Sequence, residues 1–163
     1  MERTGFNQLM AGLRPKLYRF ALSFTKRTDE AEDIVQEVGI RLWERRDELE
    51  ALRSVEAYAM SAVKNRCLDY ARSPHNRTDE LTETRDDAYG ATPHERLEQT
   101  DMAAYAKRLM ERLPEQQKMV IRLRDIEGYE LDEIAEILEM NSGAVRTALS
   151  RARQKIRDEL LKQ

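Results

Sequence analysis

Apolar residues recur three and four positions apart along the first 72 residues, as they do on the buried face of an α-helix. The spacing holds over residues 6–24, 31–42 and 55–70. Pro15 lies inside the first stretch and is expected to begin a new helix, because proline suits a first helical turn and disrupts a helix interior. Residues 1–72 therefore predict a domain of about four helices.

The pattern stops at residues 73–97, which hold prolines, a glycine and several Thr and Asp residues but almost no apolar side chain. Such a segment cannot bury enough surface to order itself, so we expect a flexible acidic linker. Helical spacing resumes at Met102 and ends in a long helix over residues 142–161. We therefore predict an all-α protein of two small helical domains joined by this linker, with the boundaries 1–73, 74–100 and 101–163.

Cys67 is the single cysteine, so no disulfide can form within the chain and a reducing compartment is favoured. Met1 is followed by a mixed polar and apolar stretch rather than the apolar core of a signal peptide. No run approaches the roughly 20 apolar residues that a membrane span needs. We expect a cytoplasmic protein without membrane insertion.

The net charge of −3 argues against indiscriminate nucleic-acid binding, but the charges of the last 40 residues are sorted along the chain. Residues 125–139 hold seven acids and no base, whereas residues 141–163 hold six bases and two acids. A basic segment inside an acidic protein indicates a confined contact with a polyanion, or else a solvated helix face.

Two short amphipathic helices, over residues 131–138 and 142–161, are separated by a turn of three residues in this same region. This arrangement predicts a helix-turn-helix, although an ordinary helical hairpin with a polar surface has the same pattern. The second helix carries small, hydroxylated and cationic residues opposite its apolar face, and its positive end favours phosphate. The candidate contacts to duplex DNA are Asn141 as the cap, Ser142, Gly143, Arg146, Thr147, Ser150, Arg151 and Arg153.

Two further polar surfaces are predicted in the first domain. Asp33, Gln36 and Glu37 lie away from an apolar stripe and suit a basic partner surface, although acids near a helix start also stabilise the helix itself. The helix over residues 55–70 carries cations, an amide and nearby tyrosines, a combination that suits single-stranded DNA or a solvated face. Its candidate residues are Lys64, Asn65, Arg66, Asp69 and Arg72.

Signals of catalysis are missing from the sequence. There is no phosphate-binding glycine loop, nucleophile elbow or Cys/His cluster with metal spacing. Both histidines, His75 and His94, fall in the predicted linker, and Cys67 lies on an apolar helix face. We expect no enzyme activity, no cofactor and no metal site.

These motifs occur together in an order that resembles the extracytoplasmic-function sigma factors. The segment DEAEDIVQEVGIRLW (29–43) resembles the helix by which sigma domain two grips the polymerase clamp. The segment AYAMSAVKNRCLDYARS (57–73) resembles the part that melts and reads the −10 element. Residues 113–157 resemble sigma domain four, whose last long helix reads the −35 element.

The resemblance implies a transcription initiation factor with core RNA polymerase, promoter DNA and an anti-sigma factor as partners. It assigns Asp33, Gln36 and Glu37 to polymerase contact and Asn65 to the region that takes up a flipped −10 base. Ser142, Gly143, Val145 and Arg146 match the start of the family's recognition helix. The chain departs from the family at three positions: Glu139 replaces a common turn glycine, Glu130 replaces Ser or Thr, and Lys64 replaces Arg.

Two other classes of protein share parts of the pattern. A helix-turn-helix regulator that binds a duplex operator by itself would need no polymerase. A helical protein-binding adaptor would bind no DNA.

Overall fold

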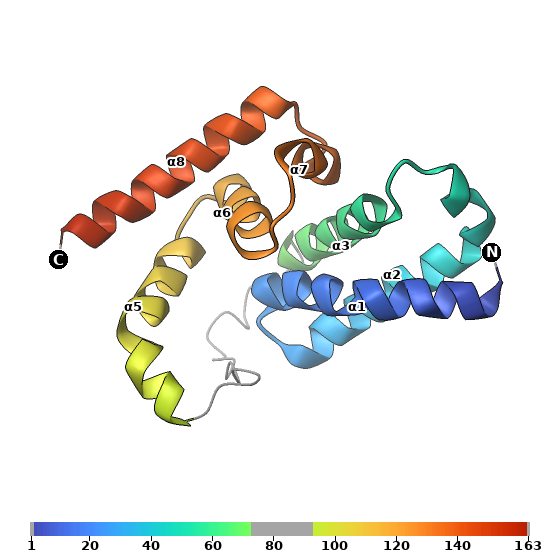
Figure 1. Ribbon diagram of the computed structural model, residues 1–163, viewed down its shortest axis with the longest axis horizontal. Coiled ribbons are helices and arrows are strands. Elements are labelled where there is room, and N and C mark those ends of the chain that lie inside the picture. Colours follow the sequence, from blue (N-terminus) through green and yellow to red (C-terminus); the bar gives the residue numbers. More distant parts are fainter. Residues whose placement is uncertain (1, 73–92, 163) are drawn as a thin grey trace. The chain divides into compact units, whose positions relative to one another are not determined.

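The computed structural model describes residues 2–72 and 93–162. Every regular element in these ranges is a helix, which confirms the all-α prediction (Figure 1). The chain divides into two compact units, residues 1–86 and 87–163. Residues 74–92 of the predicted linker, His75 included, lie outside the described residues.

The first unit packs three helices against one another: α1 (Arg3–Thr25), α2 (Thr28–Glu44) and α3 (Val55–Arg72). A short 3₁₀-helix, η1 (Arg46–Ala51), follows α2. Each α-helix turns its apolar stripe inward, and burial of such stripes is the main stabilisation of short helices. The fully buried side chains include Leu17, Phe20, Val38, Leu42, Met60 and Val63.

The prediction that Pro15 begins a new helix is wrong, because α1 runs through it. Proline has no amide hydrogen, so the carbonyl of Ala11 one turn earlier loses its helical donor. Ala11 is exposed, so water can serve that carbonyl. The buried stripe continues on both sides of the proline, from Leu13 to Leu17, and its burial keeps the two halves in one helix.

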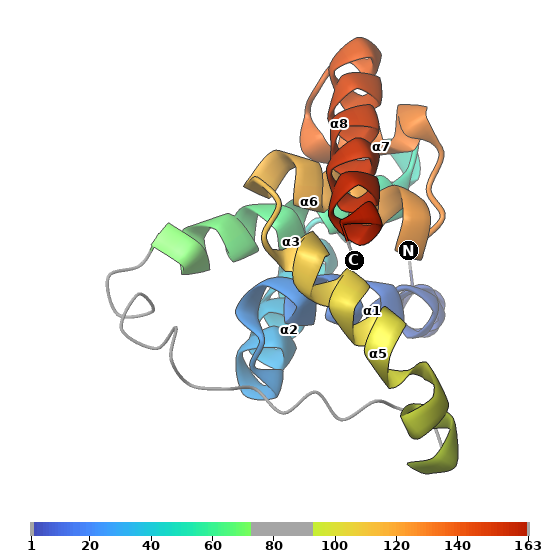
Figure 2. The ribbon, with the colours of Figure 1, turned by 90° about the vertical axis from the view of Figure 1, so that its left-hand side faces the viewer.

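The second unit holds α5 (Pro93–Glu111), α6 (Glu115–Ile121), η3 (Arg122–Ile126, a π-helix), α7 (Leu131–Leu138) and α8 (Ser142–Leu161). Figures 1 and 2 show α6 alongside α8, and α8 also packs against α5 and α7. The bounds of α7 and α8 are those expected from the sequence.

Helix α5 begins at Pro93, so residues 93–100 are helical although they were expected to belong to the linker. Proline at the first helical position is pre-organised for the helix, and the residues that follow it, HERLEQ, are mostly good helix formers. The apolar spacing that predicts order is missing from these residues, so the local pattern places the start of this helix too late.

The turn between α7 and α8 is closed by hydrogen bonds at both ends. Glu139 ends α7 in the left-handed conformation, with φ 56° and ψ 45°. Asn141 caps α8, its Oδ1 accepting a hydrogen bond from the Ala144 amide at 2.7 Å. Ser142 Oγ lies 3.3 Å from Asp132 Oδ1 and donates to it, which connects the start of α8 to α7.

We predict that Glu139→Gly stabilises the protein. A non-glycine residue in the left-handed region costs roughly 1–2 kcal/mol, and glycine adopts it freely but has more entropy to lose on folding. The net gain should be about 0.5–1 kcal/mol, seen as a higher midpoint of urea unfolding by circular dichroism. Glu139→Ala is the control: it removes the carboxylate but keeps the strain, and an equal gain from it would contradict the backbone explanation.

We also predict that Cys67 does not react with thiol reagents in the folded protein. Its side chain is fully buried, and burial raises the pKa of the thiol to about 12 despite the nearby Arg66 charge. The reactive thiolate is therefore nearly absent at pH 8. A chromogenic disulfide reagent should release colour only after urea unfolds the chain; rapid reaction of the native protein at pH 8 would show that the helix opens.

Candidate functional site

The polar surface predicted on α2 lies on the side of the helix that faces away from the core. Asp33 and Gln36 are exposed and Glu37 is half-buried, while Ile34, Val35 and Val38 on the opposite side are in the core. This surface therefore offers two carboxylates and an amide to a partner without involving the residues that hold the helix in place.

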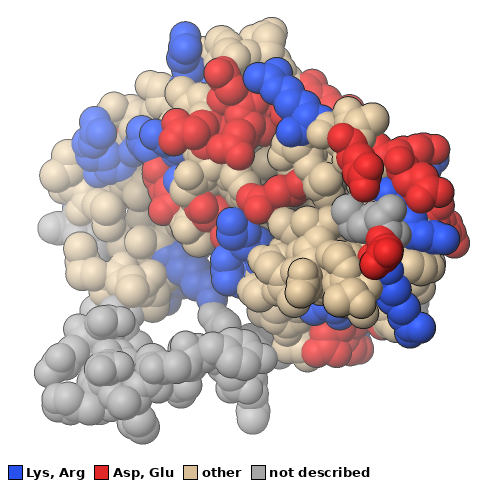
Figure 3. All heavy atoms as spheres, turned by 45° about the vertical axis from the view of Figure 1, so that its right-hand side comes forward, with Lys and Arg blue, Asp and Glu red and all other residues tan. Residues whose placement is uncertain are grey.

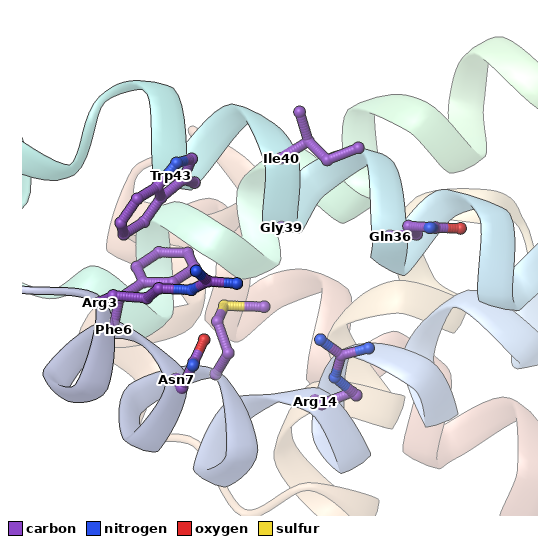
Figure 4. A pocket seen from close by; sticks show the side chains of 9 residues that line it. Arg3, Phe6, Asn7, Arg14, Gln36, Gly39, Ile40 and Trp43 are labelled. Atoms are coloured by element: carbon purple, nitrogen blue, oxygen red, sulfur yellow. The ribbon is translucent and has the colours of Figure 1, made fainter.

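A groove of about 400 Å³ lies next to Gln36, between α1 and α2. Figure 4 shows the Phe6 side chain reaching from α1 toward Trp43 of α2. The Phe6 and Trp43 rings meet edge to face at 5.1 Å. The apolar residues of its lining are Phe6, Met10, Gly39, Ile40 and Trp43, and the polar ones are Arg3, Asn7, Arg14 and Gln36.

The sequence analysis missed this groove. Ile40 is 53% exposed although it is large and apolar, and it lies off the buried stripe of α2. Trp43 is half-buried at the groove, with the Arg46 guanidinium 4.1 Å from its ring centre. An isoleucine outside the stripe is the one signal that could have indicated an interaction surface.

The candidate surface on α3 is only partly accessible. Asn65, Asp69 and Arg72 are exposed. Lys64, expected on the polar side, is only 6% exposed. It shares the buried face of α3 with Met60 and Cys67, one turn before and after it, so its aliphatic stem packs in the core.

Arg66 connects this surface to α2. Its Nε donates to Glu37 Oε2 at 2.8 Å, and its Nη1 lies 3.6 Å from Asp69 Oδ2. Arg41 approaches the other oxygen of Glu37 at 3.4 Å. Glu37 from one predicted surface and Arg66 and Asp69 from the other therefore take part, with Arg41, in a single run of four alternating charges.

The face of α8 that the sequence predicts to contact DNA lies opposite the buried side of the helix. Val145, Ala148, Leu149 and Ala152 are buried. The opposite side of the helix leaves small, hydroxylated and cationic residues accessible, namely Gly143, Arg146, Thr147, Ser150 and Arg151, after the exposed cap Asn141.

Arg153 differs from its neighbours because it is held by Asp125 of η3. Its Nε donates to Asp125 Oδ2 at 3.1 Å and its Nη2 to Oδ1, a bidentate pair. The hydrogen bonds that Arg153 donates to this carboxylate raise the pKa of Arg153 above its usual value. Arg153 therefore ties α8 to η3, a role that nothing in the local pattern indicated.

Charges of both signs are intermixed on the face of the molecule that Figure 3 displays, rather than gathered into one acidic and one basic area. In residues 2–72 and 93–162, no group of three His, Cys, Asp or Glu side chains could hold a metal ion. No described helix combines the length and the apolar character needed to cross a bilayer.

Two known family models match the chain, one in each unit. Residues 9–78 match the model of sigma-70 region 2, and residues 104–156 match the model of sigma-70 region 4. The chain is 30% identical over 170 residues to the ECF RNA polymerase sigma factor ShbA of Streptomyces griseus, covering 93% of this chain and 85% of ShbA. It is 28% identical over 162 residues to the probable RNA polymerase sigma factor RfaY of Xanthomonas campestris, covering 96% of this chain and 40% of RfaY.

Solved structures have the same fold. The sigma factor RpoE of Bartonella quintana, in complex with the anti-sigma factor NepR, aligns with a TM-score of 0.73 at 24% identity over 97% of both chains. CnrH, in complex with the cytosolic domain of CnrY, aligns with a TM-score of 0.70 at 22% identity over 99% of this chain and 91% of CnrH.

Regions 2 and 4 thus occur in one chain, in that order, and a relative at 30% identity is covered over most of its length. The chain belongs to the extracytoplasmic-function family of RNA polymerase sigma factors.

Proposed function

We propose that three separate surfaces of this sigma factor bind core polymerase and the two promoter elements. The exposed side of α2 with the adjoining groove binds core RNA polymerase, the exposed side of α3 contacts the −10 element, and the exposed face of α8 reads the −35 element. Residues 1–73 then act as sigma domain two, 101–163 as sigma domain four, and 74–100 as the connection. The observation that carries the proposal is that each exposed polar face backs onto a buried stripe, so it can bind a partner without unfolding its helix.

The polymerase surface combines two kinds of contact. Asp33, Gln36 and Glu37 suit a basic partner, and the neighbouring groove with Ile40 and Trp43 can take an apolar side chain. A buried apolar centre with a polar rim is the usual composition of a specific protein interface. Ile40 is therefore the residue whose burial should contribute most to binding core polymerase.

The −10 surface relies on Asn65, which is exposed and has both a donor and an acceptor for the edge of an unstacked base. Arg72 is exposed in the last turn of α3 and suits a phosphate. On α8, Arg146 lies about one turn after the Asn141 cap, where a docked recognition helix reaches base edges. Arg151 lies farther along and suits the DNA backbone.

The regulation and location of this factor are also proposals. The similarly folded sigma factor RpoE was solved with the anti-sigma factor NepR, which supports an anti-sigma factor as a partner here. We place its activity in the cytoplasm, with polymerase, and assign it no catalysis of its own.

The experiment that tests the proposed function is transcription in vitro with purified core polymerase. Adding this chain should give transcripts from promoters that core polymerase alone does not use. If the chain instead binds a duplex operator with the same affinity whether or not core polymerase is present, the result would favour a regulator that acts by itself.

We predict that Ile40→Glu weakens binding to core polymerase by an order of magnitude or more, because loss of a central apolar contact typically costs over 1 kcal/mol. Helicity should not change, since Ile40 is already in contact with solvent. Affinity is measured by titrating labelled protein with core. Arg53→Glu is the control, an exposed site outside the groove; equal affinities of Ile40→Glu and the parent would exclude the groove from the interface.

We predict that Arg146→Ala flattens discrimination at one base pair of the −35 element, whereas Arg151→Ala weakens all sequences alike. A lost bidentate base contact costs roughly 1–3 kcal/mol at one position, and a lost phosphate contact carries no sequence information. Both variants are compared with the parent on a promoter library varied in the −35 element. A uniform loss for Arg146→Ala, with every preference retained, would make Arg146 a backbone contact.

A further inference from the structure

Glu37 and Arg66 belong to two different proposed surfaces, yet they are bound to each other. The Arg66 Nε to Glu37 Oε2 distance is 2.8 Å, the shortest of the contacts that run from Arg41 through Glu37 and Arg66 to Asp69. The two side chains are 33% and 40% exposed, so both partners in the pair remain within reach of another molecule.

Such a pair limits what Arg66 can do in the free protein. A guanidinium flanked by carboxylates of Glu37 and Asp69 has little net positive charge to offer a phosphate, and the carboxylates themselves repel one. A partly exposed ion pair is also weak, worth about 0–1 kcal/mol, so a competing charge can replace either member. Arg41 lies 3.4 Å from the other oxygen of Glu37, so this carboxylate has a second cation beside it.

We propose that Glu37 is a positioning residue for Arg66: it restrains this arginine in the free factor, and a basic polymerase surface that binds Glu37 releases Arg66 to the DNA strand of the −10 element. This inference rests on the proposed function, because it takes α2 as the polymerase surface and α3 as the −10 surface. It adds a direct link by which occupation of one surface raises affinity at the other.

The first test measures binding of the full chain, without polymerase, to a fluorescent 20-nucleotide single strand covering the −10 element of a promoter transcribed in vitro. Glu37→Gln keeps the shape of the side chain and removes its charge. Its affinity for the strand should rise roughly two- to fivefold, the range that corresponds to a weak ion pair. The dependence of log affinity on log salt should also steepen by about 0.7, the value for one additional phosphate contact with a single strand.

Two comparisons separate this mechanism from a general loss of negative charge. Glu32→Gln removes the same charge from an exposed position of α2 and should leave both the affinity and the salt slope nearly unchanged. Glu37→Gln in an Arg66→Gln background should give no gain, because the restrained cation is gone. Equal gains from Glu32→Gln and Glu37→Gln, or a gain that persists without Arg66, would overturn the inference.

The second test uses holoenzyme at saturating core polymerase. Glu37 is then already withdrawn, so Glu37→Gln should no longer strengthen binding of the strand, and a gain as large as in the free factor would contradict the release step. The Arg66→Gln variant separates failure of the proposed function from failure of the link between Glu37 and Arg66. If it binds the strand as well as the parent, Arg66 is no −10 contact and the proposed function fails at that residue. If Arg66→Gln holoenzyme binds the strand worse than the parent holoenzyme, but Glu37→Gln binds no better than the parent in the free factor, only the link is wrong.

Discussion

Burial of one apolar stripe per helix is the constraint on which the rest of this protein depends. Helices as short as α6 and α7 are unstable alone in water, so they exist only because their apolar sides pack on neighbours. In α8 the same requirement buries Val145, Leu149 and Ala152 and leaves the opposite face to solvent. The exposed faces are therefore free to vary for binding, while the buried faces fix where each binding residue points.

Features repeated along a single helix could be predicted from the sequence. The bounds of α7 and α8 and the Asn141 cap follow from local spacing and from the chemistry of helix ends. The continuation of α1 through Pro15 could not be predicted, because it depends on burial of the helix against other helices. Likewise, the buried Leu49 inside η1 lies in a stretch that is polar by composition.

Contacts between helices could not be predicted from the local sequence pattern, for a similar reason. The partners of Arg66 and Arg153 lie 29 and 28 residues away, and spacing along one helix does not say which helix it will cross. Burial of Lys64 follows from the same geometry, since its position on α3 faces the core and its long stem can pack there. The groove next to Gln36 needs side chains from both α1 and α2, so it exists only once the two helices meet.

The tie between Arg153 and Asp125 has a consequence for the rate and the entropy cost with which α8 would bind DNA under the proposed function. Helix α8 is held at its first turn by Asn141 and Ser142 and farther along by this bidentate pair. A helix secured at two places needs no disorder-to-order transition when it enters a groove, so association does not lose the conformational freedom of a folding segment. Encounters between this factor and duplex DNA should accordingly behave as the docking of a rigid body, limited by orientation and not by folding.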